Sequence, residues 1–175
     1  MRKLVLAMSV IVAAALTIAG AVAFAHGDNG KRNFSAKLNG YQEVNSKSTP
    51  ASGRFRARIE NGGSRIHYRL SLQGFTEPGS TANVAHIHFA QRHVNGDVVA
   101  FLCGGGGKPP CNPSGTVEGD IVAADVMNTT QGIAAGEIAE LIRAMRAGAT
   151  YANVHSTRFG GGEVRGQIGK NGDRD

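Results

Sequence analysis

The residues of this chain best suited to chemistry are histidines. His86 and His88 lie two positions apart in a run of alternating apolar and polar residues, a pattern that predicts a half-buried β-strand. Side chains two positions apart on a strand project from the same face. His155 lies in a second run of this kind. If the two strands are neighbours in one sheet, we expect the three imidazoles to meet on one surface.

Three converging imidazoles would form a site for a transition-metal ion. Imidazole nitrogens bind zinc and copper, and three protein ligands leave one position open for water or substrate. We therefore interpret His86, His88 and His155 as candidate ligands of copper or zinc, with redox activity as one option.

Polar residues on the strand of His155 and on the strand expected to pair with it, residues 163–168, would lie beside these ligands. Asn153, Glu163 and Arg165 are candidates to hydrogen-bond the ligating imidazoles, because such a bond fixes the orientation of the ring. The alternative interpretation is that the histidines are ordinary hydrogen-bonded side chains that pin the neighbouring loops.

The three other histidines give weaker signals. His67 lies on an arginine-lined strand face, and His93 lies in a turn close enough in sequence to join a cluster. His26 would become the N-terminal residue after removal of a signal peptide, where its amine and ring together could chelate copper.

The hydrophobic pattern predicts an all-β domain. Alternation is clearest over residues 54–72, where two strands flank the turn at residues 61–64. We expect an antiparallel two-sheet β-sandwich with one short crossover helix. The expected strands are residues 34–38, 54–60, 65–72, 84–90, 98–102, 116–123, 151–157 and 163–168.

One segment, from about residue 136 to 147, has helical periodicity. Ile138, Leu141, Ile142 and Met145 fall on one stripe, and Gly148 follows as the expected C′ residue. A helix this short is unstable alone, so it should pack on the sheet.

The N-terminal residues predict a secretory signal peptide over residues 1–25. Two basic residues precede an apolar run at residues 4–19, and residues 23–25 form a small-x-small cleavage site. A membrane anchor is the alternative. The expected mature protein is secreted or periplasmic and has no membrane span. It has a leader at residues 26–32, a domain at residues 33–168 and a polar tail at residues 169–175.

Two cysteines, Cys103 and Cys111, predict a disulfide bond in an oxidising compartment. They would close a loop rich in glycine and proline. A metal-binding pair is the lesser alternative, because the spacing fits no zinc-ribbon pattern. Asn128 begins a glycosylation sequon whose use depends on the host.

Composition and motifs argue against several classes of function. The formal charge is +6, but the basic residues alternate with apolar ones, as on a solvated sheet face, with no clustered stripe and interleaved aromatics. Nucleic-acid binding is therefore not expected. There is no nucleophile motif and no carboxylate pair of the glycosidase type on strongly patterned elements, so we assign no catalytic residue.

Four ordered motifs, at residues 85–88, 115–121, 151–155 and 162–167, resemble the CHRD (chordin) domain of secreted bacterial proteins. The resemblance covers roughly residues 33–168. It implies a β-sandwich with a His-x-His strand partly like that of copper–zinc superoxide dismutase, although this chain has too few suitably placed histidines for a bridged two-metal centre. No enzymatic role is established for CHRD domains as a class.

We therefore expect a non-enzymatic binding or structural module outside the cytoplasm, whose partner is an extracellular protein or a cell-surface ligand. The alternative is a copper- or zinc-binding protein that uses the His-x-His site.

Overall fold

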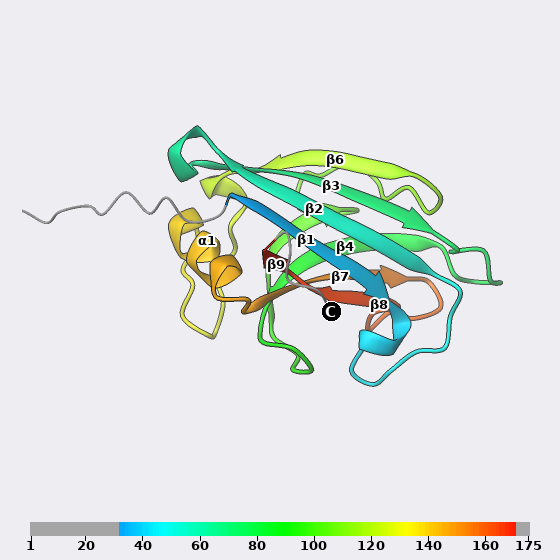
Figure 1. Cartoon of the computed structure of the whole chain (residues 1–175). Coiled ribbons are helices and arrows are strands. Elements are labelled where there is room, and N and C mark those ends of the chain that lie inside the picture. The colour runs from blue at the N-terminus through cyan, green and yellow to red at the C-terminus, as the bar shows by residue number, and fades with distance from the viewer. Residues whose placement is uncertain (1–31, 171–175) are drawn as a thin grey trace, which may run out of the picture.

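The computed structural model describes residues 32–170, which form nine strands and one α-helix (Figure 1). The predicted signal peptide, His26 and most of the predicted leader lie outside the described residues. The elements are β1 (Asn33–Asn39), β2 (Ser52–Glu60), β3 (Arg65–Gln73), β4 (Ala82–Phe89), β5 (Asp97–Cys103), β6 (Thr116–Ile121), α1 (Ile138–Arg146), β7 (Thr150–Ser156), β8 (Val164–Gln167) and β9 (Gly169–Lys170), with three 3-10 turns at Gly40–Gln42, Asn61–Gly63 and Ala123–Asp125.

All the strands belong to one hydrogen-bonded antiparallel sheet. Eight of them follow the order β5-β4-β7-β8-β1-β2-β3-β6, and β9 pairs with β1 beside them. Residues 169 and 170, which the sequence assigned to a polar tail, thus extend the sheet.

The sheet is curled nearly into a barrel. As a result, β5 and β6 at its two ends lie close to each other. The Tyr68 hydroxyl of β3 donates a 2.6 Å hydrogen bond to the Leu102 carbonyl of β5 across this closure. The antiparallel all-β fold with one helix is confirmed, but the expected division into two separate sheets is not seen. A strongly twisted sheet of eight strands tends to curl on itself, and alternation along each strand does not distinguish the two outcomes.

The inward faces of the strands form a single apolar core. In the β2–β3 hairpin Phe55 lies opposite Leu70, and Ile59 lies opposite Ile66. These four side chains are buried, whereas the arginines that alternate with them on β2 are exposed. The predicted alternation in this hairpin is therefore confirmed.

Helix α1 lies at one end of the curled sheet (Figure 1). Leu141, Ile142 and Met145 are buried in the core, so the predicted apolar stripe does pack on the sheet. The helix ends where Gly148 takes a φ of 70°, a conformation that glycine adopts without steric cost. The Gly148 N–H then donates to the Met145 carbonyl, which satisfies a carbonyl at the helix end.

We expect Leu141→Ala to lower the free energy of unfolding by about 2–5 kcal/mol, because Leu141 is fully buried and its loss leaves a cavity. Arg143→Ala on the exposed face of the same helix is the control, and should cost less than about 0.5 kcal/mol. Urea denaturation measures both values. Equal losses in the two variants would show that the apolar stripe is not buried in solution.

Candidate metal centre

The pairing of β4 with β7 places the three candidate histidines on one face of the sheet. His86 lies opposite Asn153, His88 opposite Tyr151, and Val84 opposite His155. Residues directly opposite each other in an antiparallel pair project from the same side. Ala85 and Ile87, which alternate with the histidines, are fully buried on the core side. The need to fill the core thus sends all three imidazoles to the opposite side.

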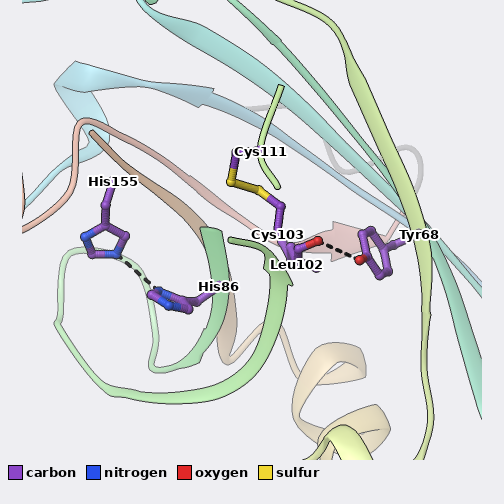
Figure 2. The surroundings of a disulfide bond; sticks show 6 residues. All are labelled: Tyr68, His86, Leu102, Cys103, Cys111 and His155. Carbon is purple, nitrogen blue, oxygen red and sulfur yellow. Dashed lines mark hydrogen bonds between the residues drawn. A yellow bond between two sulfur atoms is a disulfide. The ribbon is translucent and has the colours of Figure 1, made fainter. Parts of the chain in front are cut away.

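The three imidazoles form a compact cluster. One ring nitrogen of each lies within 4.8 Å of a ring nitrogen of both others. His86 Nδ1 and His155 Nε2 are 3.3 Å apart, and Figure 2 shows these two rings pointing toward each other. The His86 and His88 rings meet edge to face with their centroids 5.4 Å apart. His86 and His88 are buried, while His155 is partly exposed.

Backbone carbonyls fix the orientation of two of the rings. His88 Nδ1 donates to the Gly96 carbonyl at 2.9 Å, and His155 Nδ1 donates to the Gly160 carbonyl at 2.9 Å. A carbonyl oxygen can only accept, so Nδ1 carries the proton in both rings and Nε2 keeps its lone pair. His88 Nε2 is buried and has no hydrogen-bond partner among the described residues. A buried polar atom without a partner is costly and uncommon.

Burial keeps the cluster uncharged at neutral pH. Burial, together with the smaller effects of the neighbouring His155 and His88, lowers the pKa of His86 to about 3. Burial also lowers the pKa of His88 to about 4, although the hydrogen bond to Gly96 opposes this effect. The pKa of His155 is lowered by burial as well. Neutral imidazoles repel one another little and offer their lone pairs to a metal ion.

The candidate second-shell residues have partners other than the imidazoles. Asn153 donates to Glu43 Oε1 at 2.6 Å, and Glu163 accepts hydrogen bonds from the hydroxyls of Thr49 and Ser80. Asn153 and Glu163 are therefore part of a buried polar layer beside the cluster. The role that the sequence assigned to them is filled by the carbonyls of Gly96 and Gly160, which no side-chain pattern reveals.

Arg165 acts on the cluster through Tyr151. Its guanidinium carbon lies 3.4 Å from the centroid of the Tyr151 ring. The Tyr151 ring is also stacked parallel to the ring of His88, with centroids 4.7 Å apart. Arg165 also donates at 2.7 Å to the Val94 carbonyl, in the loop that supplies the Gly96 carbonyl to His88. Arg165 is among the residues predicted from the sequence to lie beside the ligands, whereas Tyr151 is not.

The two other histidines within residues 32–170, His67 and His93, do not join the cluster. His67 pairs with Asp120 at 2.8 Å on another part of the sheet. His93 lies in an exposed turn with a φ of 63° and provides no ring nitrogen to the cluster.

The predicted disulfide between Cys103 and Cys111 is present (Figure 2). Cys103 lies opposite Ala85 and is buried with it in the core. The loop that the disulfide closes packs on Phe101, since a side chain at Gly105 would lie 2.4 Å from the Phe101 ring. Phe101 of β5 lies opposite His86 of β4, with ring centroids 4.6 Å apart. The glycine loop therefore packs on Phe101, and the Phe101 ring contacts the candidate ligand His86.

Glu43 should give the protein a pH-dependent stability. Burial raises the pKa of Glu43 from 4.5 to about 7, against the lowering effects of Asn153 and Arg165. A carboxyl with a raised folded-state pKa stabilises the fold fully below its unfolded pKa and loses that contribution as the pH rises through its folded pKa. We expect Glu43→Gln to gain stability relative to the wild type between pH 4.5 and 7, by up to about 3 kcal/mol.

Urea denaturation of both proteins at pH 5, 6, 7 and 8 measures this difference. The comparison isolates Glu43, because the histidines titrate alike in both proteins. A difference in unfolding free energy that stays constant over this pH range would contradict the assignment.

Among residues 32–170, no helix is long and apolar enough to cross a membrane. A search of curated proteins and a search of solved structures found no match. The family model described as the CHRD domain matches residues 34–168, which cover most of the chain and include all three histidines of the cluster. The chain therefore belongs to the CHRD domain family.

Proposed function

We propose that this CHRD-domain protein is a non-enzymatic module that binds a zinc or copper ion outside the cytoplasm. The proposed ligands are His86, His88 and His155. The observation that carries the proposal is the buried Nε2 of His88, which has no hydrogen-bond partner among the described residues and belongs to a cluster of three imidazoles.

The separations within the cluster suit a tetrahedral ion. Zn–N bonds of about 2.1 Å imply ligand nitrogens about 3.4 Å apart. His86 Nδ1 and His155 Nε2 are already 3.3 Å apart, and the widest separation in the cluster is within 4.8 Å. Small rotations of the rings would bring all three nitrogens to bonding distance.

The surroundings also suit a bound ion. A ligating histidine usually donates its second ring nitrogen to a carbonyl or carboxylate, as His88 and His155 do to Gly96 and Gly160. Three nitrogen ligands leave one position open for water or another ligand, and the ring of His155 is partly exposed. The ligand set suits both zinc and copper.

A second candidate function is purely structural. The hydrogen bonds from His88 to Gly96 and from His155 to Gly160 tie two loops to the sheet without any metal. In that case His86 Nδ1 would donate to His155 Nε2. The two candidates differ in whether the cluster binds an ion that can be removed and restored.

We expect metal-free protein to bind one zinc or copper ion, and His88→Gln to weaken that affinity by about 100-fold or more. Titration against a chromophoric chelator measures the affinities. His67→Gln is the matched control, because it removes a histidine outside the cluster and should leave the affinity unchanged. Circular dichroism establishes that each variant is folded.

Elemental analysis of protein from its native compartment complements the titration. The wild type should carry about one equivalent of metal, and the double variant His86→Ala, His88→Ala should carry none. Equal metal content in both proteins, or equal affinity in His67→Gln and His88→Gln, would contradict the proposal. The absence of stoichiometric binding in the wild type would leave the structural function.

The proposed location is the periplasm or the exterior of the cell. The apolar run at residues 4–19 and the Cys103–Cys111 disulfide support it, because disulfides persist in oxidising compartments. We expect the mature protein to begin at His26 and to be recovered outside the cytoplasm. Cell fractionation with intact-mass measurement tests this, and full-length protein in the cytoplasm would contradict it.

A further inference from the structure

The exposed face of β1, β2 and β3 carries a cluster of positive charge that the linear sequence hides. Arg54, Arg56 and Arg58 alternate along β2 and project from one face. Lys37 of β1 lies opposite Arg54, and Arg69 of β3 lies opposite Arg56. All five side chains are exposed. We call these five residues the arginine face.

Most of this charge is not neutralised within the described part of the chain. Arg69 pairs with Glu118 at 2.5 Å on β6, at the margin of the face. Lys37, Arg54, Arg56 and Arg58 make no ion pair and no side-chain hydrogen bond with any residue between 32 and 170. Like charges directly opposite each other in a sheet are destabilising. The fold thus tolerates a repulsion that an anionic partner would relieve.

The shape of this face suits an extended partner. Two shallow hollows lie along β2, one of about 250 Å³ between Arg56, Arg58 and Arg69, and one of about 570 Å³ beside Lys37 and Arg54. The second hollow is also lined by Ser52, Ser71 and Gln73, which can bond to neutral hydroxyl groups. The Cα atoms of residues two positions apart on a strand are spaced by about 6.8 Å, so the three arginines of β2 start from evenly spaced positions along one face.

We infer that the arginine face binds a linear acidic polysaccharide. Guanidinium groups bind carboxylate, sulfate and phosphate groups through paired hydrogen bonds. The serine and glutamine side chains of the larger hollow would contact the sugar hydroxyls between the charges. The inference does not depend on the proposed metal site, because its residues lie on β1, β2 and β3, whereas the histidine cluster lies on β4 and β7.

Nucleic acids and membranes fit this face less well. The face has no exposed aromatic side chain on which bases could stack, and no helix or strand ribbon projects from it into a groove. The exposed large apolar residues within the described chain, Tyr41, Val44, Val94, Val122 and Met127, lie outside β1, β2 and β3. Nothing on the face would therefore insert into a lipid interface.

Binding of the full mature protein to immobilised polysaccharides tests the inference. Dextran sulfate and polygalacturonate probe sulfate and carboxylate recognition, and neutral dextran is the blank. We expect binding to at least one acidic polymer at about 0.15 M salt, and a decrease in affinity of about 10-fold or more in the triple variant Arg54→Gln, Arg56→Gln, Arg58→Gln. The affinity of the wild type should fall steeply with salt, and that of the variant less steeply.

The matched control is the triple variant Arg92→Gln, Arg143→Gln, Arg158→Gln, which removes the same charge from exposed positions elsewhere. It should bind like the wild type. Equal weakening in the two triple variants would show that only net charge matters and would overturn the inference. Failure to bind either acidic polymer, or tighter binding to single- or double-stranded DNA than to both, would also overturn it. Thermal unfolding shows whether the variants are folded.

Discussion

The alternation of side chains along β4 is the constraint on which the candidate site depends. Ala85 and Ile87 are apolar and fully buried, so they face the core inside the curled sheet. His86 and His88 are then forced to the other side, and the register with β7 brings His155 to meet them. A slip of one residue would exchange the two faces, bury imidazoles in the apolar core and expose the core residues. Fold and site are thus specified by the same pairing.

The far face of β4, β7 and β8 is not a solvent surface but a second, polar interior. Arg165 is only 2 % exposed and Glu163 is fully buried. Burying such groups is costly unless hydrogen bonds replace water. The loops provide them: Val94 accepts from Arg165, and Ser80 donates to Glu163. The loop of Val94 also provides the Gly96 carbonyl that orients His88, and the segment at residues 157–163 provides the Gly160 carbonyl that orients His155. The polar layer therefore orders the loops, and the loops order the imidazoles.

Much of this could be predicted from the sequence. The strands, the apolar stripe of α1 and the disulfide follow from local patterns such as the alternation over residues 54–72. The convergence of His155 with His86 and His88 required the unproved assumption that their strands are neighbours. Closure of the sheet could not be predicted, because it depends on twist summed over eight strands. Tyr151 was missed because its stacking contact with His88 joins two strands that are distant in sequence. Gly96 and Gly160 were missed because they act only through their backbone carbonyls.

The lengths of the connections explain why the two halves of the sheet present such different outer faces. The turn Asn61–Gly63 joins β2 to β3 tightly, so no loop folds back over these strands and their arginines stay in water. The longer segments at residues 74–81, 90–96 and 157–163 fold over β4, β7 and β8 and bury their outward side chains. The clustered histidines and the unpaired arginines suit these opposite environments. A neutral imidazole is tolerated in a buried layer, whereas a row of guanidinium groups requires solvent or an anionic partner. The outer surface is thus covered where the connections between strands are long, and exposed where they are short.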